Sequence, residues 1–154
     1  MLICGLPASG KSTLARRLAP TISAIRLDKD QWTTHLGHDP WDDSFRPRIE
    51  GQLWTLTQEL LATGQSVILE WGHWARAERD EKRLGARALG VGVELHYPTD
   101  APLEELIKRA DRRTASGEWT ASPMARAHFE EWAMIFQPPD EDELLLFDKP
   151  VAEG

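Results

Sequence analysis

The sequence predicts an α/β protein with three layers, in which helices cover both faces of a central parallel sheet of about five strands. Short apolar segments alternate along the chain with segments whose apolar residues recur at helical spacing, as expected for parallel strands joined by helices. A glycine-rich loop, residues 5–10, separates the first apolar segment from the first helical one. With 154 residues, the chain suits a single domain spanning residues 1–154.

The apolar segments define the expected strands, which are residues 1–4, 22–27, 66–70, 91–97 and 144–147. Helices are expected between them, at residues 11–19, 49–60, 74–89, 103–113 and 123–136, with a short helix after residue 30. Pro20 is expected to end the first helix. Ser122 and Pro123 are expected to begin the last one, as its N-cap and first helical residue.

Residues 5–13 form the most specific motif in the chain. Their sequence, GLPASGKST, fits G-x-x-x-x-G-K-[ST], the phosphate-binding P-loop, and predicts a P-loop NTPase fold. Glycine lets the backbone amides approach phosphates closely, and the helix N-terminus adds unpaired N–H groups. Lys11 would reach the β- and γ-phosphates of ATP, and the Ser12 hydroxyl would bind Mg²⁺. The expected nucleotide-binding residues here are Gly5, Ala8, Ser9, Gly10, Lys11, Ser12 and Thr13.

Acidic residues follow two of the expected strands. Asp28 and Asp30 come directly after the second strand, and Glu70 ends the third. Phosphoryl transfer to a hydroxyl needs a carboxylate that orients the acceptor and takes its proton, and a second one can hold Mg²⁺. All three are candidates for the acceptor site. The alternatives are an N-cap role for one of the aspartates and a salt bridge with a nearby arginine for Glu70.

Three arginines share one face of the helix at residues 103–113, because Arg109, Arg112 and Arg113 stand at i, i+3 and i+4. The helix leads into a glycine-containing connection, so residues 109–122 are expected to form a lid whose guanidinium groups neutralise the transferring phosphate. Arg109 and Arg113 are the expected catalytic pair, and Arg109 and Arg112 are expected to hold the nucleotide. The alternative is a solvated face balanced by nearby acidic residues.

The acceptor pocket is expected to form from residues that flank the acidic strand ends. Trp32 and other tryptophans nearby would line it with rigid aromatic surface, or would pack beneath the loops. Residues 36–48 are expected to form the acceptor-site loop. Arg79 is a further candidate substrate contact; its alternative role is in a surface salt bridge with the acidic residues interleaved around it.

Composition narrows the classes of partner. The net charge of −7 speaks against a general nucleic-acid binder, which usually presents a basic face. No apolar run approaches the ~20 residues of a membrane span, and the N-terminus shows no secretory signal. The single cysteine, Cys4, lies in an expected strand and is consistent with a reducing cytoplasm. Because Met1 already lies in the first strand, a few preceding residues are expected to be missing.

With these motifs in place, the chain resembles small P-loop kinases: the polynucleotide kinase domain, zeta toxins, chloramphenicol phosphotransferase and, more distantly, shikimate kinase. Likeness to shikimate kinase implies that Asp28 serves the Mg²⁺ and Asp30 the acceptor hydroxyl. Likeness to polynucleotide kinase implies that Arg109 and Arg113 belong to a phosphate-gripping lid helix. Thr33 and Glu70 depart from the polynucleotide kinase pattern, which has arginine and aspartate there. Residues 69–74 are also similar to AAA-type bacterial ATP-binding proteins.

The predicted function is therefore an ATP-dependent kinase that transfers the γ-phosphoryl group to a hydroxyl of a small-molecule acceptor. ATP is favoured over GTP because the guanine reader Asn-Lys-x-Asp needs asparagine, and the sequence contains none. Two alternatives stay open. One is a kinase acting on the 5′-hydroxyl of a nucleic acid, and the other is a nucleotide-binding switch or slow NTPase with a protein partner.

Overall fold

The computed structural model describes residues 1–98 and 101–150. Its sheet contains four parallel strands in the order β2-β3-β1-β4. They are β1 (Leu2–Ile3), β2 (Ala24–Asp28), β3 (Ser66–Glu70) and β4 (Leu95–His96). β3 pairs along its whole length with β2, so that Asp28 and Glu70 are register partners at the carboxyl edge of the sheet.

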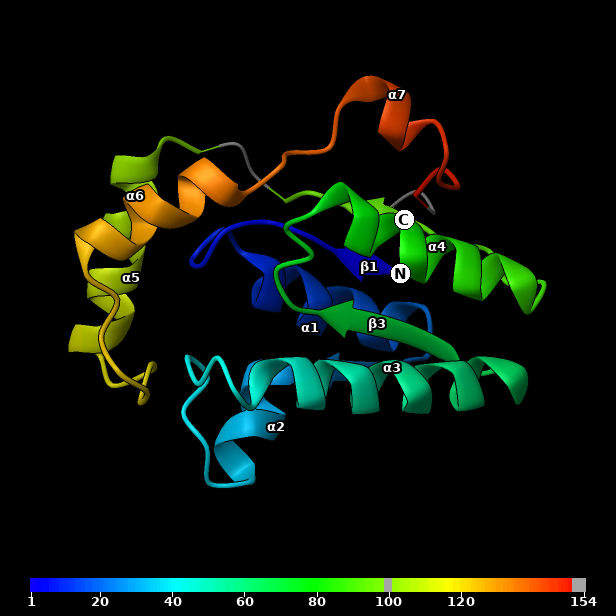
Figure 1. The fold of residues 1–154 in the computed structure, drawn as a ribbon, viewed down its shortest axis with the longest axis horizontal. Coiled ribbons are helices and arrows are strands. Elements are labelled where there is room, and N and C mark those ends of the chain that lie inside the picture. Colours follow the sequence, from blue (N-terminus) through cyan, green and yellow to red (C-terminus); the bar gives the residue numbers. More distant parts are fainter. Residues whose placement is uncertain (99–100, 151–154) are drawn as a thin grey trace.

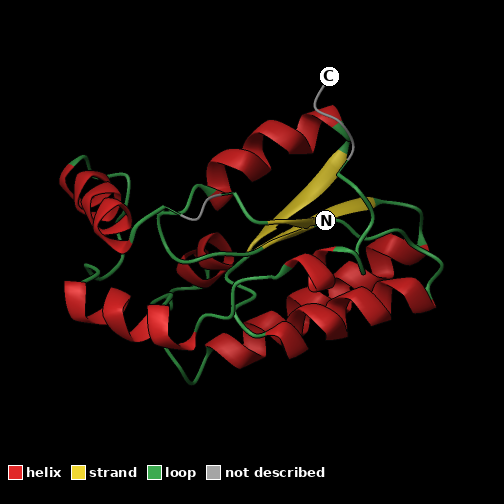
Figure 2. Ribbon diagram, turned by 90° about the horizontal axis from the view of Figure 1, so that it is seen from above, coloured by secondary structure: helices red, strands yellow, loops and turns green. Residues whose placement is uncertain are grey.

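Helices cover both faces of the sheet, as the alternating pattern predicts (Figure 2). The helix α1 (Lys11–Thr21) packs on one face against β2 and β3, and α3 (Arg46–Ala62) packs on the other. The helix α4 (Arg76–Ala88) lies beside α3. The short α2 (Lys29–His35) follows β2 directly and contacts the start of α3. The predicted three-layer α/β architecture is confirmed.

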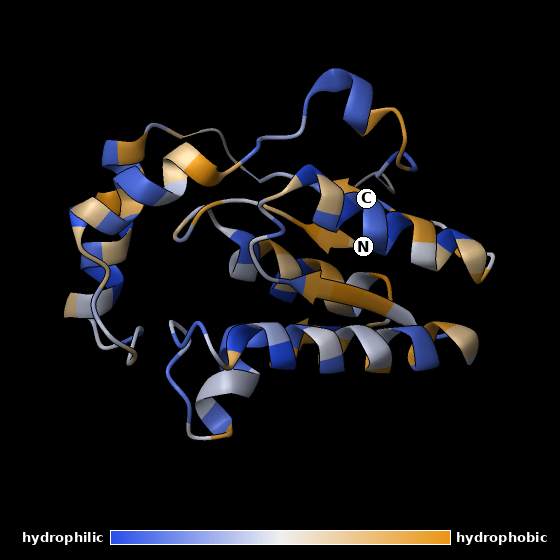
Figure 3. Ribbon diagram, in the orientation of Figure 1, coloured by the Kyte–Doolittle hydropathy of each residue, from blue (hydrophilic) through white to orange (hydrophobic). Residues whose placement is uncertain are grey.

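The hydrophobic core has one part on each face of the sheet, and Figure 3 shows the strands between them as the most apolar elements. Strand residues alternate between the faces because successive side chains of a strand point to opposite sides. Ile3 and Ile68 pack with Ala15 and Leu18 under α1. The larger part, under α3 and α4, contains Leu2, Cys4, Leu27, Ile49, Leu53, Val67, Leu69, Trp71, Ala86, Val93, Leu95 and Phe147.

A pair of helices, α5 (Leu103–Ala115) and α6 (Arg126–Ile135), stands at the carboxyl edge of the sheet, on the left in Figure 1. Their facing sides bury a third apolar cluster, which joins the P-loop through Leu6. Its other buried members are Leu106, Ile107, Ala110, Met124, Phe129 and Phe136. The pair is therefore packed against the loop that the sequence assigns to nucleotide phosphates.

The structure corrects the expected fifth strand. Residues 144–147 form no strand; a short helix, α7 (Glu141–Leu144), and a turn take their place. The Asp140 side chain caps this helix by accepting a hydrogen bond from the Glu143 N–H at 2.7 Å, and three acidic residues in its first turn favour the helix dipole. The sheet of the described residues thus has four strands instead of about five.

Several expected element boundaries also shift for local reasons. Pro20 lies inside the last turn of α1. The last major helix begins at Arg126 instead of Pro123, because the Ser122 hydroxyl donates to Asp39 at 2.6 Å and does not cap the helix. β4 is shorter than expected because the Val93 N–H donates to the Asp148 carboxylate at 2.6 Å. Among the described residues, no helix combines the length and the apolar character needed to cross a membrane.

Candidate active site

The P-loop links β1 to the N-terminus of α1, and its backbone conformation explains its glycines. Gly5 has a φ of 141° and Gly10, which precedes the helix, has a φ of 94°, both in the region that favours glycine. A Cβ on Gly5 would also lie only 2.7 Å from the Ser9 Oγ. The Ser9 hydroxyl is buried and has no hydrogen-bond partner among the described residues, so it remains available to a ligand.

Lys11 begins α1 and folds its side chain back over the P-loop. Its Nζ donates to the carbonyl oxygens of Gly5 at 3.0 Å and Leu6 at 2.7 Å. Burial lowers the pKa of this amine to about 8, and the carboxylates of Asp30 and Glu70 partly oppose that shift. The ammonium group therefore rests on backbone oxygens in a poorly solvated position, from which an anionic phosphate would attract it strongly.

The two acidic strand ends meet beside the P-loop, and an arginine links them. Arg26, on β2, places Nη1 2.6 Å from Glu70 Oε2 and 3.2 Å from Asp28 Oδ2. Burial, followed by the nearby charge of Asp28, raises the pKa of Glu70, whose side chain also bonds to the Ser12 hydroxyl. Both expected alternatives are thus observed: Asp28 caps α2 through the Gln31 N–H at 3.1 Å, and Glu70 pairs with an arginine.

Asp30 is the second residue of α2 and lines the same cavity as Lys11. Partial burial, with a smaller contribution from the charge of Asp28, raises its pKa above the ordinary value for aspartate, while Lys29 and Lys11 act in the opposite direction; the side chain is still 46% exposed. Lys29 Nζ lies 3.9 Å from Asp30 Oδ1 and 3.2 Å from Glu50 Oε1. Asp30 is therefore a carboxylate of raised basicity whose closest cation is shared with another acid.

The arginine face of α5 also points toward the P-loop, and each arginine has an acidic partner. Arg109 Nε and Arg112 Nη2 lie 3.0 Å and 3.2 Å from the same Glu105 oxygen. Arg113 lies 3.4 Å from Glu118 and stacks over the ring of Trp119. Such ion pairs are what we expect if the arginines form a solvated face balanced by nearby acidic residues. Because most of them are well exposed, they can exchange partners at little cost.

A single cavity of about 810 Å³ unites these groups. It is lined by the P-loop, by the acidic residues at and after the ends of β2 and β3, and by the arginines of α5. Its charged and polar lining residues include Lys11, Ser12, Arg16, Arg26, Asp28, Lys29, Asp30, Glu70, Glu105, Arg109, Arg112, Arg113 and Glu118. Trp41, Trp71, Trp74 and Trp119 line it as well. Residues separated by more than a hundred positions in sequence therefore face one space.

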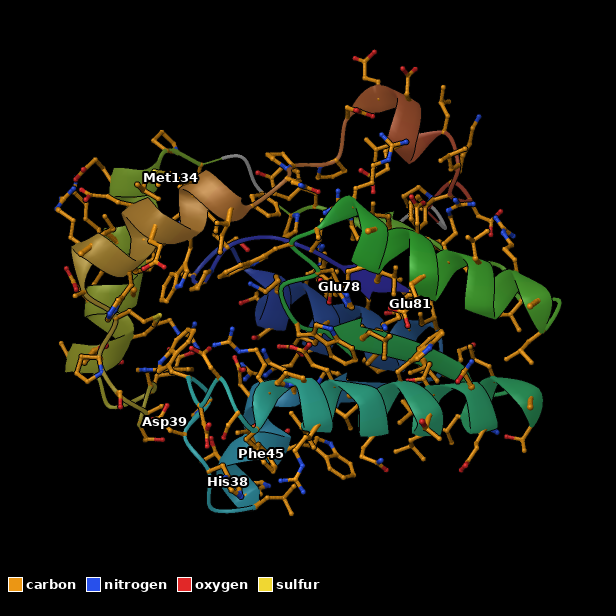
Figure 4. All side chains as sticks on the ribbon, in the orientation of Figure 1. His38, Asp39, Phe45, Glu78, Glu81 and Met134 are labelled. Atoms are coloured by element: carbon orange, nitrogen blue, oxygen red, sulfur yellow. The ribbon has the colours of Figure 1, made fainter. Side chains whose placement is uncertain are left out.

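The connection between α5 and α6 is fastened to the loop at residues 37–45. The carbonyl of Ser122 accepts hydrogen bonds from the indoles of Trp41 at 3.3 Å and Trp119 at 3.0 Å. The Ser122 hydroxyl donates to Asp39 at 2.6 Å, and this contact lowers the pKa of Asp39. Figure 4 shows Asp39 facing this connection from the opposite loop. We call these three hydrogen bonds the Ser122 latch.

The comparison with known protein families identifies the family of this chain. Residues 1–139 match the AAA domain family. The chain belongs to that family. None of the curated proteins matches this AAA domain closely enough to count as a relative.

Solved structures share the fold of this AAA domain. A chain of the Pnkp1/Rnl/Hen1 RNA repair complex is 22% identical with a TM-score of 0.75; the match covers 96% of this chain and 45% of that chain. A gluconokinase from Sinorhizobium meliloti 1021 is 18% identical, with a TM-score of 0.63 and coverage of 92% and 76%. Chaetomium thermophilum Kti12, in complex with ADP-AlF3, is 18% identical, with a TM-score of 0.71 and coverage of 90% and 80%.

These likenesses confirm the expected P-loop kinase fold and the expected resemblance to small P-loop kinases. At identities below 25%, they show the fold alone. The AAA domain spans less than half the length of the RNA repair chain that it matches. The substrates of these proteins are therefore not assigned to this chain. Its chemistry is inferred from its own cavity.

Two residues expected to contact substrate, Trp32 and Arg79, do not line this cavity. Trp32 lies on α2 two positions after Asp30, a rotation of roughly 200° that turns it away from the P-loop. It lines a separate apolar hollow with Leu36, Phe45, Arg48, Ile49, Gln52, Leu53 and Leu56. Figure 4 shows Phe45 beside His38 at this end of the molecule, where their rings stack at 3.7 Å.

Arg79 is fully buried and has a structural partner in place of a substrate. Its Nε and Nη2 donate to the two carboxylate oxygens of Glu143 at 2.6 Å and 2.7 Å, a bidentate pair between α4 and α7. Its Nη1 donates to the carbonyls of His73 and Trp74. In the sequence, Arg79 is one of several charged residues of α4. Its partner Glu143 lies 64 positions away, so the sequence does not reveal the pair.

Sequence reasoning missed Arg26, which lies at the centre of the acidic edge. The strand periodicity could have indicated it: Arg26 and Asp28 are two positions apart on β2, and residues at that spacing project to the same face of a sheet. Glu105 and Glu118 are further cavity-lining residues that the sequence does not single out.

Proposed function

We propose that this AAA domain is an ATP-dependent kinase that transfers the γ-phosphoryl group of ATP to a hydroxyl of a small-molecule acceptor. One observation carries the proposal: the P-loop, the basic carboxylate of Asp30 and the arginines of α5 line the same cavity. A phosphoryl transferase needs these three elements facing one another, because catalysis consists of positioning the reactants and stabilising charge. The fold supports the nucleotide-dependent part of the proposal.

In the proposed reaction, the amides of the P-loop and the ammonium of Lys11 hold the phosphates. Asp30 accepts the proton of the acceptor hydroxyl while that oxygen attacks the γ-phosphorus. The bond between the γ-phosphorus and the bridging oxygen breaks, and the electron pair stays with ADP. Arg109 and Arg113 neutralise the charge that spreads over the transferring oxygens, and Arg112 helps to hold the nucleotide. The P-loop, Asp30 and the arginines of α5 each have a role in this reaction.

The residues beside Ser12 fit a magnesium ion. Ser12, Asp28 and Glu70 supply a hydroxyl and two carboxylates, the oxygen donors that Mg²⁺ prefers. Burial raises the pKa of Glu70, and the nearby charge of Asp28 adds to the rise; a divalent cation would offset both effects. Ser12 and Asp28 are proposed to hold the ion, which would neutralise charge on the nucleotide phosphates. Arg26 meanwhile keeps the two carboxylates side by side.

A small acceptor is favoured by how the cavity is closed. The Ser122 latch joins the loop at residues 36–48 to the segment at 109–122, and these are proposed to be the acceptor-site loop and the lid. The chain also carries a net charge of −7, and Glu105 and Glu118 place acidic groups among the arginines at the mouth. A polynucleotide is the second candidate, because one chain of the same fold belongs to an RNA repair complex.

The test is transfer of labelled phosphate from ATP to panels of sugars, nucleosides, antibiotics and 5′-hydroxyl oligonucleotides, followed by identification of the product. We expect a labelled small molecule with the parental protein and none with Lys11→Ala. A labelled oligonucleotide would support the second candidate. ATP hydrolysis that no acceptor stimulates would instead indicate a switch or slow NTPase, and failure to bind ATP at all would refute the proposed kinase.

A further inference from the structure

One nitrogen of an arginine bridges the two carboxylates at the carboxyl edge of the sheet. Arg26 Nη1 lies 2.6 Å from Glu70 Oε2 and 3.2 Å from Asp28 Oδ2. The other terminal nitrogen, Nη2, donates to Gln31 Oε1 at 3.4 Å. The guanidinium is therefore held by acceptors from β3, β2 and α2, directly beside both carboxylates of the proposed magnesium site.

Strand pairing, and not a loop, sets this arrangement. Arg26 and Asp28 are two positions apart on β2 and project to the same face of the sheet. Glu70 is the register partner of Asp28 in the parallel pair of β2 and β3, which brings its side chain to that face as well. The backbone of two paired strands therefore keeps the three charges together.

Solvent screens these three charges poorly. The Glu70 side chain is 3% exposed, that of Asp28 is 14% exposed and that of Arg26 is 20% exposed. Charges interact more strongly at such positions than in bulk water. Arg26 leaves the two ionised carboxylates with a single uncompensated negative charge between them. A divalent cation arriving alone would therefore meet weakened attraction and direct repulsion from the guanidinium.

The rest of the described chain offers no substitute for the missing negative charge. Within residues 1–98 and 101–150, no three acidic, histidine or cysteine side chains are grouped so that they could hold a metal ion. Mg²⁺ in such sites usually takes one or two carboxylates and completes its shell with water and substrate phosphates. The phosphates of a nucleotide would supply the negative charge that Arg26 offsets on the protein.

We propose that Arg26 is a positioning residue that closes the pair of Asp28 and Glu70 to divalent cations arriving without nucleotide. The inference rests on the magnesium site of the proposed function. It goes further by giving an arginine outside the P-loop motif control over when that site accepts a metal. Arg26 acts through the two carboxylates and not on the reacting atoms.

The decisive substitution is Arg26→Gln, which removes the charge and keeps a side chain that can donate hydrogen bonds. The probe is Mn²⁺ without nucleotide, because Mn²⁺ takes the same oxygen ligands as Mg²⁺ and its unbound form is measured directly by electron paramagnetic resonance. We expect the dissociation constant for Mn²⁺ to fall at least about tenfold, since a unit charge no longer repels the dication. Loss of a merely structural arginine would weaken metal binding instead.

Three controls separate the charge from other effects of the substitution. Arg26→Lys keeps the positive charge and should bind Mn²⁺ as weakly as the parental protein; binding as tight as that of Arg26→Gln would overturn the inference. Arg83→Gln removes an arginine that pairs with Asp80 on α4 and does not line the cavity, and should change nothing. Adding Glu70→Gln to Arg26→Gln should abolish the gained binding; if the gain persists, the metal lies elsewhere and the inference fails.

Arg26→Met is the second uncharged variant if Arg26→Gln does not fold. Equal Mn²⁺ affinity in the parental protein and the uncharged variant would overturn the inference. Micromolar binding of free Mn²⁺ by the parental protein that Glu70→Gln abolishes would overturn it too, and this measurement needs no Arg26 variant. A parental protein that does not bind ADP would refute the proposed function instead; because the Mn²⁺ titration contains no nucleotide, the two failures are distinct.

Discussion

At the scale of single residues, the site depends on a few charged groups whose environment shifts their protonation. Lys11 has its pKa lowered to about 8 by burial, whereas Asp30 and Glu70 have theirs raised for the same reason. A lysine and a carboxylate shifted in opposite directions within one cavity are the acid–base arrangement that catalytic sites use. Both shifts lead to measurable pH dependences.

The pKa of Lys11 predicts how nucleotide affinity changes with pH. Phosphates attract the ammonium form, and in the free protein that form is lost as pH rises through about 8. We therefore expect the ADP affinity to be constant below that pH and to fall by up to about tenfold for each pH unit above it. Calorimetry between pH 7.5 and 9.5 measures this. Lys11→Arg should flatten the profile because a guanidinium stays charged; a flat parental profile would contradict the prediction.

Asp30 is predicted to be the base that receives the acceptor proton. Asp30→Asn keeps the shape and removes the base, so the rate of transfer should fall by ~10²–10⁴-fold while ADP affinity stays nearly constant. Because burial raises the pKa of Asp30, the parental rate should increase with pH through a value above that of ordinary aspartate, and the variant should lack this limb. If Asp30→Asn transfers phosphate at the parental rate, Asp30 is not the base, and Asp28 and Glu70 become the candidates.

At the scale of elements, two loops that border the cavity are joined by hydrogen bonds. The Ser122 latch connects the proposed lid between α5 and α6 to the proposed acceptor-site loop. Trp41 adds to it by stacking on Trp132 of α6 at 4.8 Å. Much of this contact is exposed and polar, so it should open more readily than the core. Figure 4 places Met134, a further α6 residue, on the outer side of this helix pair.

The latch predicts the behaviour of Ser122→Ala. This variant loses the hydrogen bond to Asp39 but keeps the Ser122 carbonyl that both indoles use. We expect faster trypsin cleavage within residues 113–126 and a KM for the acceptor raised severalfold, with ADP affinity unchanged. Ser44→Ala is the matched control, since the Ser44 hydroxyl bonds only within its own loop, to Asp42. Equal cleavage of the two variants would show that the latch does not hold the lid.

At the scale of the whole molecule, a buried ion pair joins α7 to α4 and to the loop that follows β3. The helix α7 lies above α4 in Figure 1, and the pair formed by Arg79 and Glu143 joins them where solvent is excluded. Arg79 in turn binds the backbone that carries Trp74, whose indole N–H donates to the Gly5 carbonyl of the P-loop. The stability of the fold and the geometry of the P-loop are therefore coupled through one ion pair.

Glu143→Ala tests this coupling, because it leaves the buried guanidinium of Arg79 without a counter-charge. We expect the free energy of unfolding, measured with urea, to fall by about 3–5 kcal/mol. Glu104→Ala is the control: it breaks the bidentate but exposed pair between Glu104 and Arg126, and should cost far less. A small effect of Glu143→Ala would show that the buried pair contributes little to holding α7.

The sequence by itself determined the P-loop, most of the order of strands and helices, and some of the charged residues that line the cavity: Asp28, Asp30, Glu70 and the arginines of α5. These are local properties, because a loop conformation or a helical face depends on residues within a few positions of one another. The short strand β4 and the helix α7 were harder to predict, since side-chain contacts from Asp148 and capping by Asp140 decided them.

Only the tertiary structure decided how the site is supported. Arg26 meets Glu70 across 44 positions, Trp74 meets Gly5 across 69, and Arg79 meets Glu143 across 64. No local pattern records such pairs, since many charged residues of the same type occur nearby and the packing of β-strands and helices selects among them. The same packing turned Trp32 away from the cavity and buried Arg79, which is why their chemistry alone predicted the wrong surroundings.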